Sequence, residues 1–205
     1  MSIANYSDLK TAVANWLNRS DLTSYVSDIV MLGEAKIYRE LRIRAMETAL
    51  SDTIASGVIA VPSDYIEMKH AYVDGSSTES LQRVSLERMY EAYPTRSADG
   101  KPKFYAREAG NFIFGPYPDS GYTVKGVYYK RMTALSDSNT TNWFTTNAPD
   151  ILLWASLVEA EAFIKNDPRL PMWKDRYEES KAMIQDEDDK EAWSGGSPRA
   201  RNSWK

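Results

Sequence analysis

The apolar residues near the start of the chain recur with a helical period. Their offsets of three, four, seven and eight residues place them on one face: Leu9, Ala12, Val13, Trp16 and Leu17. This pattern predicts an amphipathic helix, with Ser7 in the position of its capping residue. After turn residues at 18–21, a second apolar periodicity predicts a longer helix over residues 24–45.

Four basic residues gather toward the end of that second helix, where they outnumber the acidic ones: Lys36, Arg39, Arg42 and Arg44. Helix carbonyls concentrate negative potential at this end, which gives the cluster an explanation within the chain. The alternative is an interface with an acidic neighbour, which makes these four residues candidates for a contact between subunits.

Between residues 48 and 131 the apolar period changes to two, which is typical of strands. The strands are predicted at residues 58–61, 66–73, 103–107, 111–114 and 122–131. Ala109-Gly110 indicates a hairpin, and Ser85 indicates the cap of a short helix. His70 alternates with Met68 and Tyr72, a setting that favours a half-buried strand residue over a catalyst or metal ligand.

Helical periodicity returns after Pro149, a residue suited to the first turn of a helix. Residues 151–165 are apolar on most sides, so this helix belongs at the centre of a bundle or at a subunit interface, and we favour burial mainly within the subunit. A last helix is expected over residues 170–185. The acidic run at 186–191 lacks the glycine and ligand spacing of a calcium loop, so we interpret it as a solvated segment.

The order of elements is helices, then strands, then helices, with no Gly/Ser-rich linker between them. This order predicts an α+β fold: a discontinuous helical bundle, built from the N- and C-terminal helices, with an inserted antiparallel β-rich domain. The expected boundaries are 1–46 for the N-terminal helices, 47–135 for the β domain, 136–185 for the C-terminal helices and 186–205 for an extended C-terminal arm.

Composition removes several kinds of chemistry. The chain of 205 residues has no Cys, which excludes disulfides and thiolate chemistry, and one His, which leaves little imidazole chemistry. A net charge of −4 does not suit a dedicated nucleic-acid binder. Neither a signal peptide nor an apolar stretch long enough to cross a bilayer is apparent, so we expect a soluble protein with no membrane partner.

Candidate catalytic groups are few. Gly100-Lys101 is followed by Pro102 and so does not form a phosphate-binding loop. The carboxylates that acid–base or two-metal chemistry would need fall in turns and caps: Asp64, Glu67, Asp119 and Asp150. We therefore expect no enzyme, no metal and no cofactor. The aromatics and cations of the β section leave one alternative open, an accessory DNA-binding protein, and a carboxylate-based hydrolase ranks third.

Several short stretches have a familiar order and spacing along the chain. They lie at residues 6–9, 16–22, 34–42, 61–65, 100–105, 112–118, 127–129, 135–136 and 149–155. Together they resemble the head-to-tail adaptor, or connector, proteins of short-tailed bacteriophages, the group that includes tail tubular protein A. The resemblance covers about residues 6–184, and its motifs consist of scaffold residues without a catalytic signature.

The resemblance implies a structural virion protein, assembled in the host cytoplasm and located in the neck or tail region. Such adaptors form a ring, usually of twelve copies, that joins the portal protein to tail nozzle or tail fibre proteins. The ring leaves a channel for double-stranded DNA during packaging, retention and ejection. Copies with a net charge of −4 would surround that channel with negative charge, which does not trap DNA as a basic lining would.

The resemblance also implies that a C-terminal extension reaches the portal. In this chain that position falls to residues 192–205, where tryptophans suit pockets and positive charges suit carboxylates. The residues expected to dock on the portal are Trp193, Pro198, Arg199, Arg201, Trp204 and Lys205. A disordered tail is the alternative.

Overall fold

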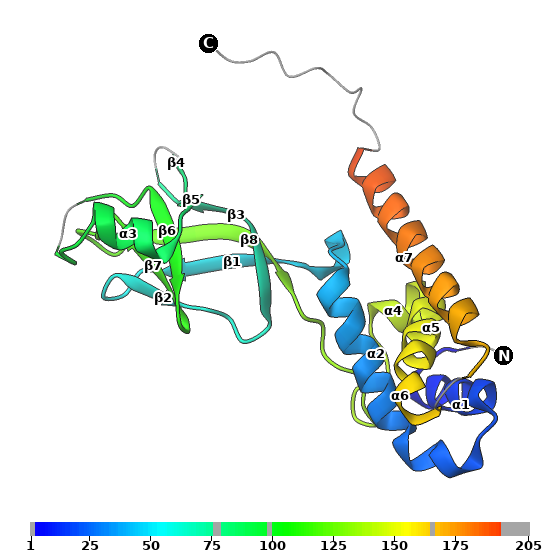
Figure 1. The fold of residues 1–205 in the computed structure, drawn as a ribbon. Helices are drawn as coiled ribbons and strands as arrows, with labels where there is room; N and C mark the ends of the chain where they lie inside the picture. Colours follow the sequence, from blue (N-terminus) through cyan, green and yellow to red (C-terminus); the bar gives the residue numbers. More distant parts are fainter. Residues whose placement is uncertain (1–2, 76–78, 98–99, 165–166, 194–205) are drawn as a thin grey trace. The chain divides into compact units, whose positions relative to one another are not determined.

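Two compact units divide the chain between them, and the second is inserted into the first. The computed structural model describes residues 3–75, 79–97, 100–164 and 167–193. One unit combines Met1–Ala45 with Met132–Lys205, and the other comprises Met46–Arg131 (Figure 1). The first is helical and the second is built mainly of strands, which confirms the α+β class. Residues 132–135, assigned above to the β domain, lie in the helical unit, because Leu135 is buried there.

The first helix, α1 (Tyr6–Leu17), buries most of the face that its apolar period marks out, although Trp16 on that face stays 41% exposed. Its buried residues include Leu9, Ala12, Val13 and Leu17. The capping residue is Asn5 and not Ser7, because the Asn5 side chain accepts a hydrogen bond from the amide of Asp8 at 3.0 Å. Ser7 already lies inside the helix.

The second helix is shorter than its apolar pattern predicts. A 3₁₀ helix (Ser20–Tyr25) precedes α2 (Val26–Glu40), and the backbone becomes extended at Leu41. The predicted end at residue 45 is wrong because Leu41 and Ile43 are both buried at a spacing of two, which is the period of an extended chain.

The apolar helix α5 (Pro149–Glu159) lies at the centre of the helical unit. It packs against α1, α2 and the C-terminal helix α7 (Leu170–Trp193), and most of its side chains are buried. Two short helices, α4 (Trp143–Asn147) and α6 (Glu161–Ile164), lie on either side of it in the chain. Pro149 occupies the first turn of α5, as predicted, and the helix is buried within the subunit.

The close approach of α2 to α5 depends on a glycine. A Cβ atom at Gly33 would lie 2.8 Å from the backbone nitrogen of Ser156 and 2.9 Å from its Oγ. Ser156 is fully buried, and its hydroxyl donates to the carbonyl of Leu152 at 2.7 Å, so neither atom can move away easily. The two helices therefore touch where α2 carries no side chain.

Replacing this glycine tests the packing of the two helices. Alanine favours a helix over glycine by about 1 kcal/mol, whereas overpacking a buried contact costs about 1–3 kcal/mol. Because the obstruction is backbone, we expect Gly33→Ala to lower the free energy of unfolding by about 1–2 kcal/mol in chemical denaturation. Ser27→Ala, on the exposed face of α2, is the matched control and should change stability by less than about 0.5 kcal/mol. Equal stability of G33A and wild type would contradict this packing.

Helix α7 extends well beyond its predicted end at residue 185 and reaches Trp193. Trp173, Tyr177 and Ile184 form its buried stripe. The acidic stretch 186–191 continues the helix and is not the start of an extended arm. A salt bridge between Lys190 and Asp186, four residues apart, supports these turns. Arg44 also contacts them.

The β unit consists of two four-stranded sheets that share one core. The order of the first sheet is β1 (Glu47–Thr53), β8 (Thr123–Lys130), β3 (Tyr65–Val73) and β4 (Glu79–Ser80). The order of the second is β2 (Val58–Ala60), β7 (Asn111–Gly115), β6 (Phe104–Glu108) and β5 (Gln82–Arg83). The ladders are antiparallel apart from the parallel pair β5–β6.

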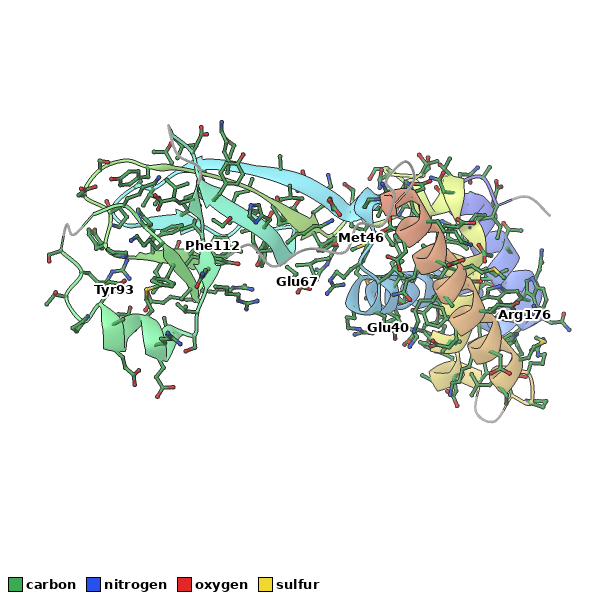
Figure 2. All side chains as sticks on the ribbon, turned by 90° about the horizontal axis from the view of Figure 1, so that it is seen from above. Glu40, Met46, Glu67, Tyr93, Phe112 and Arg176 are labelled. Carbon is green, nitrogen blue, oxygen red and sulfur yellow. The ribbon has the colours of Figure 1, made fainter. Side chains whose placement is uncertain are left out.

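Alternate residues of the second sheet point to its two faces, one toward the core between the sheets and the other toward helix α3 (Leu86–Ala92). Phe112, which Figure 2 labels, lies in the core between the sheets. Ile113, its neighbour in β7, packs under Met89 of helix α3, which covers the other face. Ser85 caps α3 as predicted, since its hydroxyl accepts a hydrogen bond from the amide of Arg88 at 3.2 Å.

His70 is exposed, contrary to the half-buried position predicted for it. The pairing of β3 with β8 shifts register between Met68 and His70. This irregularity interrupts the period of two, so Met68 and Ala71 both pack on the core. His70 instead stacks on Tyr72, with ring centres 5.7 Å apart.

Candidate functional site

The four basic residues predicted for a subunit contact do not form one cluster. Lys36 and Arg39 lie on α2, and Arg42 and Arg44 lie on the segment that follows it. Three of them contact other groups of the chain, each in a different way. Arg39 is exposed, and no acidic side chain of the described residues lies within salt-bridge distance of it.

Helices α2 and α7 meet at the carboxylate of Glu40, which Figure 2 labels. It accepts hydrogen bonds from Lys36 Nζ at 2.8 Å, from Lys181 Nζ at 3.0 Å and from the Tyr177 hydroxyl at 3.0 Å. Partial burial alone would raise the pKa of Glu40, but these hydrogen bonds outweigh it and lower the pKa to about 2. Two cations and one hydroxyl therefore hold a single ionised carboxylate at this junction.

Arg42 closes the end of α2. Its Nη1 donates to the carbonyls of Tyr38 at 2.9 Å and Leu41 at 2.7 Å. An α-helix leaves such carbonyls without partners in its last turn. Arg42 therefore stabilises the C-terminal end of α2, which is the explanation within the chain that its position in the sequence suggested.

Arg44 joins the segment after α2 to the end of α7. Its backbone amide donates to Asp188 Oδ1 at 2.9 Å, and its guanidinium pairs with both Asp188 and Glu191. Most of the run 186–191 is exposed, in agreement with its interpretation as a solvated segment, but two of its carboxylates also face a cation brought by a distant part of the chain.

The residues predicted to dock on the portal lie at the end of the chain. Trp193 is the last residue of α7. The others lie outside the described residues: Pro198, Arg199, Arg201, Trp204 and Lys205. Figure 1 shows the last turns of α7 extending beyond the neighbouring helices of its unit. Arg44 contacts these last turns of α7 through Asp188 and Glu191.

A buried carboxylate that we did not predict as a site lies on the opposite side of α2. Glu34 is 4% exposed and accepts hydrogen bonds from the Leu135 amide and from Asn142 Nδ2, both at 3.0 Å. Burial raises the pKa of Glu34, and the two hydrogen bonds oppose that shift. The sequence contained a signal for it, since Glu34 falls on the same helical face as the buried Val30 and Ile37.

The carboxylates considered for catalysis each have a structural partner or an exposed position. Asp64 accepts from the Tyr128 hydroxyl, Asp119 from that of Tyr122, and Asp150 from that of Ser180. Glu67 is exposed on β3. Within the described residues, no group of three or more His, Asp or Glu side chains is arranged to hold a metal ion.

The cations considered for DNA binding are partly engaged within the β unit. Lys101 pairs with Glu79 at 3.5 Å, and Lys125 pairs with Asp74 at 2.7 Å. Arg107 lies over the ring of Tyr65, 5.6 Å from its centre. These contacts use positive charges that a phosphate-binding patch would need.

A family model described as SU10 adaptor protein matches residues 4–202, which is nearly the whole chain. The chain belongs to the SU10 adaptor protein family. No curated protein matches it. Membership confirms the resemblance to phage head-to-tail adaptors that the sequence suggested.

The adaptor family has a structural role in phages, and it implies contact with portal and tail components in the virion neck. In the part of this adaptor that the structure describes, none of the helices combines the length and the apolar character needed to span a bilayer.

The junction at Glu40 makes the stability of the adaptor depend on pH. The pKa of Glu40 falls from 4.5 to about 2 in the folded chain, so the ionised form stabilises the fold above pH 4.5 and this contribution is lost as the pH falls toward 2. We expect Glu40→Gln to lower the free energy of unfolding by on the order of 1 kcal/mol at pH 7. The deficit should shrink at pH 3 in urea denaturation. Glu179→Gln, an exposed residue of α7, is the control, and an E40Q deficit that does not change with pH would contradict the assignment.

Arg44 should control the order of the last turns of α7. In Arg44→Ala, Asp188 and Glu191 lose their cation, and we expect amide hydrogen exchange over residues 186–193 to accelerate by roughly three- to tenfold. Lys174→Ala, on the same helix, removes an exposed pair with Glu161 and is the matched control. Unchanged exchange in R44A would show that α7 holds its end without this contact.

Proposed function

We propose that copies of this adaptor form a closed ring, of about twelve, that joins the portal to the tail and leaves a channel for double-stranded DNA. The family match over residues 4–202 carries this proposal. The discontinuous helical unit supports it, because a bundle closed by both ends of the chain can present an inserted unit and a C-terminal segment to different partners.

The net charge supports a channel through which DNA slides. Each copy carries a net charge of −4, so a ring multiplies this negative charge around its axis. A basic lining would bind DNA by releasing counterions, whereas an acidic lining gives no such affinity. In this proposal the adaptor has a structural role and acts through its shape and its contacts.

We assign portal docking to the C-terminal segment and contact with nozzle or fibre proteins of the tail to the β unit. The residues assigned to the portal are those proposed from the sequence: Trp193, Pro198, Arg199, Arg201, Trp204 and Lys205. Two features support this assignment. The segment follows a long helix whose end is held by Arg44, and it combines aromatic anchors with cations that suit carboxylates.

Mass photometry of the purified chain, alone and with the portal ring of the same phage, tests the proposal. We expect monomers that assemble into a ring of about twelve copies on the portal. A chain that ends at residue 191 keeps Glu191 beside Arg44 and should stay folded, but should lose most of its portal binding. Full binding by this shortened chain would remove the docking assignment. Absence of portal binding by the whole chain, with salt-sensitive binding to DNA, would favour the accessory DNA-binding function.

A further inference from the structure

The helical unit leaves large apolar side chains exposed on two helices, and the exposed faces that carry them are called here the α2 stripe and the α7 stripe. On α2, Met31 and Leu32 keep 57% and 36% of their surface exposed. On α7, Met183 keeps 57%. Methionine is enriched at protein interfaces relative to the rest of the protein surface.

Charges flank the two stripes in opposite order. On α2, Asp28 precedes the apolar residues and Arg39 follows them, and all are exposed. On α7, Arg176 precedes Met183 and Glu187 follows it. Each charged pair is eleven residues apart, which is about three turns or 16 Å along a helix, so its members share one face. When the helices run in the same direction, each charge on one helix lies opposite an unlike charge on the other.

The apolar residues fit the same register. Ala35 stands seven residues after Asp28, and Met183 stands seven residues after Arg176. The register therefore places the long Met183 side chain over the small side chain of Ala35, with Leu32 beside it. Unbranched methionine adapts to a shallow surface of this kind.

The two stripes lie on different sides of the helical unit and do not meet within one copy. Helix α2 presents Lys36 and Glu40 to α7, and α7 presents Tyr177 and Lys181 to α2. Figure 2 shows Arg176 on the side of the unit away from Glu40. Each stripe is thus available to a separate neighbour, as an interface between two different patches of one chain requires.

In a ring, α2 of one copy and α7 of the next run in the same direction, which is the direction that places their unlike charges opposite one another. Lys36 and Glu40 meet Tyr177 and Lys181 in the same order along the chain, so α2 and α7 are parallel within one copy. Adjacent copies in a ring of about twelve differ by a rotation of about 30°. Such a rotation keeps α2 of one copy nearly parallel to α7 of the next.

We infer that the α2 surface formed by Asp28, Leu32, Ala35 and Arg39 binds the α7 surface formed by Arg176, Met183 and Glu187 of a second copy. The inference rests on the proposed ring for the direction of the helices. Of the four basic residues first considered for a subunit contact, it assigns that role to Arg39 alone.

Charge reversal in the full chain tests the contact. Arg39→Glu and Glu187→Arg each place like charges together, and each should weaken the association of copies by on the order of tenfold. The double variant R39E/E187R should restore it. Ring formation on the portal is measured by mass photometry, and association of the chain alone by sedimentation velocity. Arg88→Glu and Glu87→Arg, on α3 of the β unit, are matched reversals that should change neither measurement.

Cross-linking tests the apolar register independently. The chain has no Cys, so the double variant A35C/M183C contains only the two introduced thiols. The inferred contact brings thiols of adjacent copies within disulfide range, and mild oxidation should yield a ladder of covalent oligomers. Either single variant should yield no ladder.

The outcomes separate this contact from the proposed function. Rescue of R39E by Glu179→Arg in place of Glu187→Arg would overturn the parallel register. Portal-bound rings that none of these changes affects would overturn the contact and leave the proposed function standing. Charge rescue in the chain alone, without portal binding, would support the contact and contradict the portal role. No association in either sample would contradict both.

Discussion

The carboxylate of Glu34 helps to join the two separate pieces of chain that form the helical unit. Because the β unit occupies residues 46–131, the helical unit is built from two pieces of chain that are joined by non-covalent contacts. Glu34 accepts a hydrogen bond from the backbone amide of Leu135, in the piece of chain that follows the β unit. It accepts a second from the side chain of Asn142, which caps α4. Burial of a carboxylate is costly, and the two hydrogen bonds offset that cost only while both donors are in place. One acidic group on the first piece of chain therefore defines where the second piece enters, and α5 then packs against α2 at Gly33.

The contacts between α2 and α7 are of a different kind. They lie near the surface, where a single ion pair contributes little to stability. Glu40 is more effective because three donors converge on it, and Arg44 because it binds through its backbone amide as well as its guanidinium. Apolar packing on α5 holds the bundle together, and these polar contacts set the line that α7 follows as it leaves the bundle. Because the role of this protein is structural, the direction in which α7 leaves the bundle matters for its function.

Sequence reasoning found the class of fold and most of the elements, because they follow from local period and from turn residues such as Ser85 and Pro149. It failed where tertiary contacts override local pattern. Leu41 continued an apparent helical pattern although its backbone is extended. The acidic turns of α7 were assigned to an arm, because the approach of Arg44 from a distant segment leaves no pattern in the nearby sequence. The four basic residues are neighbours in the sequence but do not form one cluster, because their separate partners depend on the packing of α2 against α7, which no short stretch of sequence reveals.

The insertion of the β unit has a mechanical consequence. The chain connects the two units covalently at two places, one after Ala45 and one before Met132, and both connections carry part of any force applied to the β unit. Both connections end on α2: the first continues from it, and the second is fastened to it at Glu34 through Leu135. A pull on the β unit therefore loads α2 directly from the first connection, and loads it through the Leu135–Glu34 hydrogen bond from the second. Arg44 directly precedes the first connection and also contacts the end of α7, so the segment that leads into the β unit and the last turns of α7 are held together within the helical unit.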